Sequence, residues 1–178
     1  MKTYKKLFAA TILAASIFVT QSAKSNDSFD KKYNKIILSI MKSALFKIHG
    51  VKNFEEFQKH YRSLINLTLL REKNANCCIN EQPLIFFATS INNVNLVKKL
   101  ISMGASVNSK TKFGETPLIL LIFSSLIFKF DPTQLAELLI KHGASPKAGN
   151  YQGKNAIETA RYLCSDKMLK VFKKYGYC

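Results

Sequence analysis

Acidic residues are scarce in this chain of 178 residues: 11 aspartates and glutamates face 27 lysines and arginines, and the formal net charge is +16. The acids form no pair suited to catalysis, because Glu55 and Glu56 are adjacent and point to different sides of a helix. Ser124 and Ser125 lie in an apolar run without a neighbouring histidine or acid, and the seven glycines form no Gly-x-Gly loop. We therefore expect no enzyme, no cofactor and no small-molecule substrate.

Metal-binding side chains are also few, with four cysteines and three histidines. Cys77 and Cys78 are adjacent and lack the two-residue spacer of zinc-binding pairs. His49, His60 and His142 fall in separate predicted helices. This pattern predicts no metal site.

No apolar run is long enough to span a bilayer. The run Leu7–Val19 has 13 residues, follows three lysines within the first six positions, and precedes small residues at 20–25. This order is typical of a secretory signal peptide, here residues 1–25, with cleavage after Ser22, Ala23 or Ser25. A buried N-terminal helix is the alternative. We expect an exported protein, periplasmic or secreted.

A positive charge of this size attracts acidic proteins, anionic membrane surfaces or nucleic acid. The lysines are scattered through every segment, however, and form no arginine-rich stripe with interleaved aromatic residues. We therefore rank an acidic protein partner first, an anionic membrane surface second and nucleic acid a distant third. Solubility combined with an AT-biased coding sequence would also explain the lysines.

Two near-copies of one unit dominate the second half of the chain. Leu96–Ser106 is echoed by Leu135–Ser145, and each copy predicts an amphipathic helix that ends at a Gly-Ala pair. Thr116-Pro117-Leu118 predicts a helix start, because threonine is a good N-cap and proline suits the first helical position.

The same unit returns near the end of the chain. Asn155-Ala156-Ile157 keeps the register of the helix start, and a last helix, Met168–Tyr175, ends at Gly176. Pro83 and Pro117 are 34 positions apart, and Gly143 and Gly176 are 33 apart. Gly104 and Gly143 are 39 apart, so the middle unit has about six extra residues.

A period near 33, a Thr-Pro-Leu helix start and a Gly-Ala helix stop together resemble the ankyrin repeat, over Glu81–Cys178 in about three units. The resemblance implies an all-α solenoid of helix-turn-helix units, each with a projecting β-turn finger. The histidine that usually follows Thr-Pro-Leu is replaced by Ile85, Ile119 and Glu158, and Asn80 and Gln82 also depart from the family pattern.

Two further helical patterns precede the repeats. The first places Ile36, Ile37, Ile40, Met41, Ala44, Leu45 and Ile48 on one face, and the second starts at Asn53 and aligns Phe54, Phe57, Tyr61, Leu64, Ile65 and Leu69. We interpret residues 26–72 as an N-terminal helical cap and residues 73–178 as the ankyrin-repeat domain. A degenerate fourth unit is the alternative, in which Leu70 takes the place of the glycine and Asn74 falls where the family often has asparagine.

The run Leu118–Phe130 is almost entirely apolar and contains the extra residues of the middle unit. It predicts either a first helix that is longer by about a turn and a half or a bulky apolar loop. Packing onto the N-terminal helices is one expectation for this run. An exposed patch for docking is the other.

Four cysteines in an exported chain suggest disulfides. A ten-residue helix of roughly 15 Å separates Cys164 from Cys178, whereas bridged Cα atoms lie within about 7 Å of each other. We predict no firm pairing, with Cys77 and Cys78 exposed and available for intermolecular bonding.

Three segments correspond to fingers: 71–81, 106–114 and 145–153. Transferred by position, the family's variable contact sites fall on Ile79, Glu81, Lys110, Lys112, Phe113, Glu115, Phe123, Tyr151, Gln152, Lys154 and Tyr162. Phe123 and Tyr162 would serve equally well as core residues.

The resulting hypothesis is an exported, non-enzymatic module that binds an acidic protein through its concave face and fingers. An effector that engages a host protein and a periplasmic inhibitor or immunity-type protein both fit this chemistry. The alternative is a basic peripheral component of the envelope that binds anionic lipid or polysaccharide.

Overall fold

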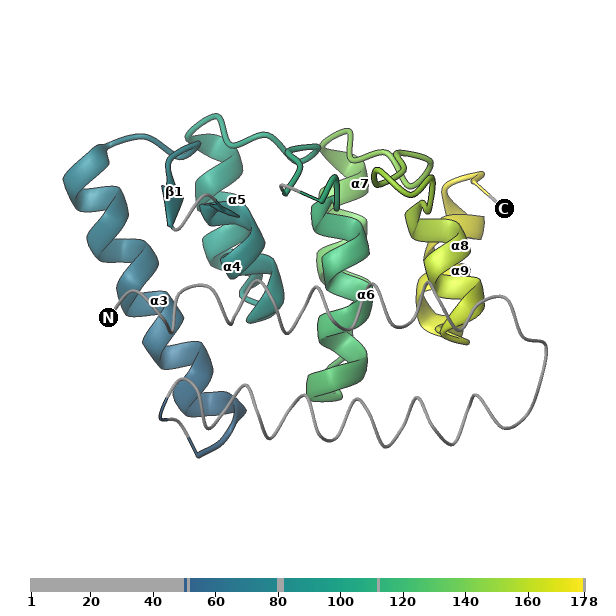
Figure 1. Cartoon of the computed structure of the whole chain (residues 1–178), viewed down its shortest axis with the longest axis horizontal. Coiled ribbons are helices and arrows are strands. Elements are labelled where there is room, and N and C mark those ends of the chain that lie inside the picture. Colours follow the sequence, from purple (N-terminus) through teal and green to yellow (C-terminus); the bar gives the residue numbers. More distant parts are fainter. Residues whose placement is uncertain (1–49, 51, 80–81, 112, 178) are drawn as a thin grey trace.

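Three helical hairpins stand side by side in the computed structural model of the chain, which describes residues 50, 52–79, 82–111 and 113–177 (Figure 1). The hairpins are α4 (Leu84–Ser90) with α5 (Val94–Ser102), α6 (Pro117–Phe128) with α7 (Thr133–Lys141), and α8 (Ala156–Tyr162) with α9 (Asp166–Lys174). They follow α3 (Phe54–Glu72) and a short antiparallel ladder, β1 (Cys78–Ile79) with β2 (Gln82–Pro83). The expected all-α repeat fold is confirmed. The signal peptide and the helix predicted around Ile36–Ile48 lie outside the described residues.

The second helix of every hairpin ends in the same way. Gly104, Gly143 and Gly176 follow α5, α7 and α9 with φ angles of +89°, +88° and +76°, in the left-handed region that favours glycine. The next residue closes the helix: the Ala105 and Ala144 amides donate to the carbonyls of Leu100 and Leu139, each over 2.9 Å. The helix stops inferred from the Gly-Ala pairs are therefore equivalent positions of a repeat.

The first helix of each hairpin begins with a different N-terminal residue. The Thr116 hydroxyl accepts from the Ile119 amide (3.4 Å), with Pro117 at the first position of α6. In α8, Asn155 and Glu158 form a reciprocal capping box. Pro83 precedes α4 without a side-chain cap. The three starts share one register despite this variation.

The extra residues of the middle unit lengthen α6, which has 12 residues against 7 in α4 and 7 in α8. Phe128, in the last turn of α6, stacks on Phe54 with ring centroids 4.4 Å apart and lies 5.2 Å from Phe57. Phe130 follows and lies 5.7 Å from Phe54. The run therefore packs onto the helix that precedes the repeats, as one of our two expectations proposed.

Helix lengths explain this contact. At 1.5 Å per residue, the 19 residues of α3 extend over about 28 Å, whereas α4 beside it covers only about 10 Å. Tyr61, near the middle of α3, reaches Phe87 of α4 at 5.2 Å, and its burial raises the pKa of its hydroxyl. The first turns of α3 extend past α4 and would expose Phe54 and Phe57 without the added turns of α6.

Asparagine side chains connect successive units. Asn108 donates to the Gly143 carbonyl (2.8 Å) and accepts from the Ser145 amide (2.9 Å). Asn76 does the same one unit earlier, with the Gly104 carbonyl (2.9 Å) and the Ser106 amide (3.1 Å). The segment after α3 thus contacts the first repeat through the same kind of hydrogen bonds that join the repeats to each other.

The end of α3 differs in position from the helix end that the repeat spacing would give. Lys73, with a φ of 49°, ends α3 in the left-handed conformation, three positions after Leu70. Asn74 accepts a local hydrogen bond from the Asn76 amide (2.8 Å), and Asn76 makes the contact to the next unit. The shift arises because α3 continues for a further turn before its cap.

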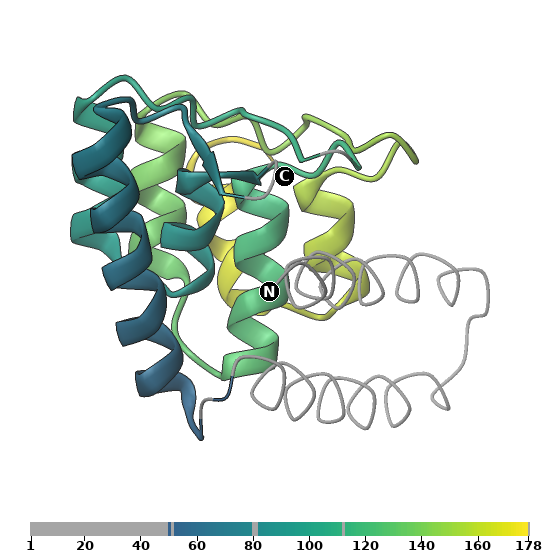
Figure 2. The ribbon, with the colours of Figure 1, turned by 60° about the vertical axis from the view of Figure 1, so that its left-hand side comes forward.

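The hairpins form two rows of helices. The inner row is α4, α6 and α8, and the outer row is α5, α7 and α9, with α3 at the open end of the stack (Figure 2). One continuous core runs through the stack and includes Ile65 of α3, Leu100 of α5, Leu121 of α6 and Phe172 of α9. Within the described residues, no helix is long and apolar enough to cross a membrane.

Replacing Phe128 with alanine tests the contact between α6 and α3. Phe128→Ala removes a buried ring that stacks on Phe54, and we expect it to lower the free energy of unfolding by roughly 3 kcal/mol. Leu70→Ala is the control, because Leu70 is 74% exposed on α3, and its loss should cost less than about 0.5 kcal/mol. Urea unfolding followed by circular dichroism measures both. Equal effects of the two substitutions would contradict the packing described above.

Candidate partner-binding surface

The second and third fingers are turns of the same design. In the second finger, the Thr111 amide donates to the Glu115 carbonyl (3.0 Å), and the Gly114 amide donates to the Thr111 carbonyl (2.8 Å). In the third finger, Asn150 takes the place of Thr111, with matching bonds to Lys154 (2.8 Å) and from Gly153 (3.0 Å). These closed turns fix the backbone of both tips.

In each turn, one side-chain oxygen accepts hydrogen bonds from two backbone amides. The Thr111 hydroxyl accepts from the amides of Phe113 (3.3 Å) and Glu115 (3.2 Å). The Asn150 side-chain oxygen accepts from the amides of Gln152 (3.0 Å) and Lys154 (3.0 Å). The residues between these anchors, including Phe113 and Tyr151, are thereby held at the finger tips.

The two fingers also pack against each other. The Tyr151 amide donates to the Phe113 carbonyl (3.3 Å), and the Lys110 ammonium donates to the Gly149 carbonyl (2.9 Å). The same ammonium lies 6.0 Å from the centre of the Tyr151 ring. Lys110, Phe113 and Tyr151 therefore form one surface, which we call the finger platform.

The finger platform combines an accessible aromatic ring with positive charge. Tyr151 is 73% exposed, Lys110 is exposed and Phe113 is half-buried. A lysine at this distance from an aromatic ring makes a weak cation–π contact, worth about 0.5–1 kcal/mol at an exposed site. Since both groups remain accessible, they are available to a partner.

Three other predicted contact residues lie in the third unit. Gln152 is exposed beside Tyr151, and Lys154 and Tyr162 are half-buried. Ile79 lies in β1, opposite Gln82. Glu81 and Lys112 lie outside the described residues, as does the side chain of Ile79.

Two predicted contact residues are buried. Glu115 is 3% exposed, at the base of the second finger, and Phe123 is 2% exposed, inside α6. We correct both assignments, since neither side chain lies at the surface. For Phe123 the core alternative holds, because α6 is apolar on every side and is buried along almost its whole length.

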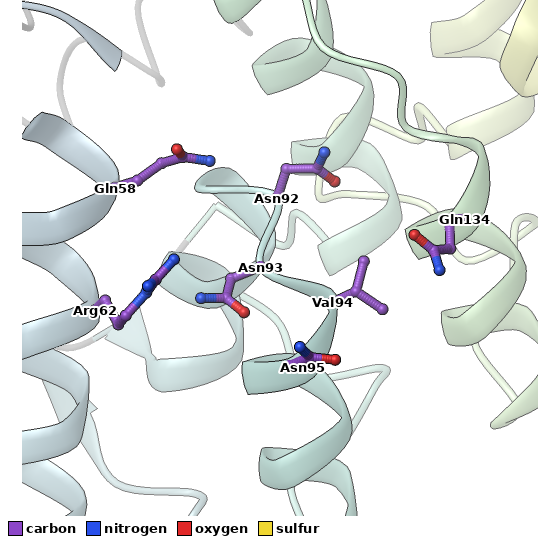
Figure 3. Close-up of a pocket in the computed structure, with 7 residues that line it drawn as sticks. All are labelled: Gln58, Arg62, Asn92, Asn93, Val94, Asn95 and Gln134. Atoms are coloured by element: carbon purple, nitrogen blue, oxygen red, sulfur yellow. The ribbon is translucent and has the colours of Figure 1, made fainter. Parts of the chain in front are cut away.

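Sequence analysis missed a pocket of about 340 Å³ on the outer side of the stack (Figure 3). It lies between α3, the start of α5 and α7, and is lined by Gln58, Arg62, Asn92, Asn93, Val94, Asn95 and Gln134. Gln58 donates to the Ile91 carbonyl (2.7 Å), and the Asn92 side-chain oxygen is buried without a hydrogen-bond donor among the described residues. The cluster of asparagines at 92–95 was the available signal. The pocket offers polar contacts and one positive charge.

Two acidic side chains on the outer side of the stack form ion pairs with lysines. The Lys167 ammonium lies 2.6 Å from an Asp131 carboxylate oxygen, and this hydrogen bond lowers the pKa of Asp131 to about 2. The Lys174 ammonium lies 2.7 Å from Glu137, where it lowers the pKa of Glu137 while its own pKa rises. Glu137 belongs to α7 and Asp131 lies two residues before that helix, and both lysines belong to α9. Their acids are therefore partly neutralised, and the surface stays basic.

The structure describes three of the four cysteines. Cys78 and Cys164 are exposed, whereas Cys77 is half-buried against the core, so the expected exposure holds for Cys78 but not for Cys77. Cys178 lies outside the described residues.

Among the residues that the structure describes, no three of the histidine, cysteine and acidic side chains gather into a group that could hold a metal ion.

Comparison with known proteins identifies two ankyrin-repeat relatives. The chain is 31% identical over 98 residues to ankyrin repeat protein R664 of Acanthamoeba polyphaga mimivirus, covering 54% of this chain and 57% of the relative. It is 32% identical over 76 residues to ankyrin repeat protein FPV024 of Fowlpox virus, covering 43% of this chain and 12% of the relative. The chain thus spans little more than half of one relative and a small part of the other. No family model matches the sequence.

These similarities agree with the fold and support an ankyrin-repeat protein. They also indicate a protein–protein interaction module, since stacked repeats of this kind present an extended surface for binding. Both relatives are viral proteins.

A pair of glycine substitutions tests the contact between the fingers. Gly114 and Gly104 have φ angles of +78° and +89°, so alanine strains the backbone similarly at both. At Gly114, however, a Cβ atom would lie 2.7 Å from the Tyr151 amide nitrogen, whereas at Gly104 nothing lies within 4 Å. We expect Gly114→Ala to lower the melting temperature clearly more than Gly104→Ala and to increase amide hydrogen exchange in the third finger. Similar behaviour of the two variants would show that the fingers do not touch at this point.

Proposed function

We propose that this chain is an exported, non-enzymatic module that binds an acidic protein through the finger platform and the adjoining surface of the last repeat. The finger platform is the observation that carries the proposal: Tyr151, 73% exposed, lies beside the Lys110 ammonium on a turn held by its own hydrogen bonds. Export rests on the signal-peptide pattern of residues 1–25.

Rigid aromatic side chains are effective anchors in protein interfaces, because they bury a large apolar area with little loss of conformational freedom. Tyr151 and the half-buried Phe113 supply such area, and their backbones are hydrogen-bonded to each other. Lys110 beside them, and the exposed Lys147 of the third finger, favour a partner with carboxylates. This arrangement suits either an effector that engages a host protein or a periplasmic inhibitor.

The alternative function is a peripheral envelope component that binds anionic lipid or polysaccharide. The observation in its favour is the net charge of +16, carried by lysines distributed along the chain. Binding of this kind depends on total charge rather than on two aromatic side chains. The two functions therefore differ in their response to substitutions in the finger platform.

Substitutions in the finger platform separate these functions. A partner is captured from periplasm and from host lysate with the whole chain as bait, identified by mass spectrometry, and its dissociation constant is measured. We expect Tyr151→Ala and Phe113→Ala to weaken a one-to-one complex about tenfold or more, since central aromatic residues often contribute 2 kcal/mol or more. Lys110→Ala should mainly slow association and reduce its salt dependence.

Lys98→Ala is the control, because Lys98 is an exposed lysine of α5, outside the fingers. It should leave the affinity of the complex unchanged. Salt-sensitive binding to anionic liposomes that survives both aromatic substitutions, without a one-to-one protein complex, would support the envelope role and contradict the proposal.

A further inference from the structure

The pocket on the outer side of the stack, which we call the outer pocket, has walls that hydrogen bonds already hold. The Gln58 side chain donates to the Ile91 carbonyl over 2.7 Å, so α3 is joined to the turn between α4 and α5. In that turn, the Asn92 side chain donates to the Asp131 carbonyl over 3.4 Å, and the Asn93 side-chain oxygen caps the first turn of α5. Three lining side chains are thus held in place before any ligand arrives.

Other lining side chains keep their polar groups accessible. Arg62 is exposed, and its guanidinium has no carboxylate partner in the described part of the chain, where the two recorded ion pairs use Lys167 and Lys174. The side-chain amides of Asn95 and Gln134 are also exposed and make no hydrogen bond among the described residues. The outer pocket therefore presents hydrogen-bond donors that no other described group uses.

These groups surround one space. In Figure 3, Gln58 and Arg62 extend from α3 towards the turn that leads into α5, and Gln134 lies on the other side, on α7. Asn93 and Asn95 lie between them. The volume of about 340 Å³ is near the lower end of the range of roughly 300–1,000 Å³ that is usual for ligand pockets. The outer pocket can therefore accept one side chain together with its neighbouring peptide groups.

The chemistry of the lining decides which ligand suits the outer pocket. Arg62 carries the only charge among the described lining residues, and none of them is acidic. A guanidinium presents parallel N–H donors that match the two oxygens of a carboxylate. Side-chain amides both donate and accept hydrogen bonds, as the peptide group requires. Because Val94 is the only apolar residue in this lining, an apolar or aromatic ligand would gain little there.

The outer pocket is separate from the finger platform. It includes the first residues of α5, whereas the second finger follows the last turn of the same helix. The nine residues of α5 extend over roughly 13 Å between these two places. A ligand in the outer pocket therefore leaves Lys110, Phe113 and Tyr151 accessible.

We propose that the outer pocket is a second binding site, which takes the carboxylate of an acidic peptide segment. The Arg62 guanidinium binds the carboxylate, and the side-chain N–H groups of Asn93, Asn95 and Gln134 bind the peptide groups that flank it. An aspartate or glutamate side chain and the carboxyl terminus of a chain share this chemistry. The inference does not rest on the function proposed for the finger platform, because it uses other residues at the other end of α5.

Three short peptides distinguish these sources in an NMR titration of the full chain. Ac-Gly-Glu-Gly-NH2 offers a side-chain carboxylate, Ac-Gly-Gln-Gly-OH offers a terminal carboxylate, and Ac-Gly-Gln-Gly-NH2 is the neutral control. We expect at least one acidic peptide to shift the amide signals of Asn93, Val94 and Asn95 in a saturable way. The neutral peptide should bind at least about fivefold more weakly, since it lacks the charged acceptor.

Substitutions at Arg62 test the contact to the carboxylate. Arg62→Gln should weaken binding of the acidic peptide at least about fivefold, because it removes both the charge and the paired donors. Arg62→Lys retains the charge alone and should restore only part of the affinity. Lys59→Gln is the matched control, because it removes a positive charge from an exposed position of α3 outside the outer pocket, and it should leave the affinity unchanged. Tyr151→Ala should also leave it unchanged, so this test is independent of the finger platform.

Several results would overturn the proposal. Equal binding of the neutral peptide would show that the outer pocket does not recognise charge. Shifts spread over many exposed lysines, and reduced as much by Lys59→Gln as by Arg62→Gln, would show a general attraction to a basic surface. Full affinity in Arg62→Lys would contradict the paired contact to the carboxylate. No saturable shift at residues 93–95 with either acidic peptide would show that the outer pocket does not bind this ligand.

Discussion

The structure depends on apolar helices that no single hairpin can cover. In α6, eleven of the twelve residues are buried, so the helix needs neighbours on every side. The inner-row helices α4 and α8 and its own partner α7 supply three of them. Near its carboxyl end, Phe128 and the following Phe130 pack on α3.

Hydrogen bonds from polar side chains fix how successive units align, whereas apolar packing alone is not directional. Asn76 and Asn108 each bond to the carbonyl of a helix-ending glycine and to an amide two residues later, in the next unit. Lys110 reaches the third finger in the same way, through the Gly149 carbonyl. These contacts align the turns on one edge of the stack. The finger platform is a consequence of that alignment, since Phe113 and Tyr151 come from different units.

Much of the fold could be predicted from the sequence because its signals are local. The helix ends at Gly104 and Gly143 need a positive φ angle, and the start at Thr116 needs a side-chain acceptor, so residue type alone identifies them. Burial of Glu115 and Phe123 depends on which helices and turns surround them, and sequence spacing does not contain that information. Asn74 falls where the family often has asparagine, but Asn76 makes the contact to the next unit, because α3 continues to Glu72. The outer pocket combines side chains from α3, α7 and the segment at the start of α5, so the asparagines at 92–95 indicate only one of its walls.

Native-state hydrogen exchange on the full chain tests most directly the claim that α6 is enclosed on all sides. Amides of buried, fully surrounded elements exchange only on global unfolding, whereas helices with an open face exchange through smaller local openings. The enclosed core predicts that amides of Leu121–Ser125 in α6 exchange slowest and at the rate of global unfolding. Amides of α8, which exposes Glu158 and Arg161, should exchange faster. Exchange in α6 as fast as in α8 would contradict the enclosure on which this account of the fold depends.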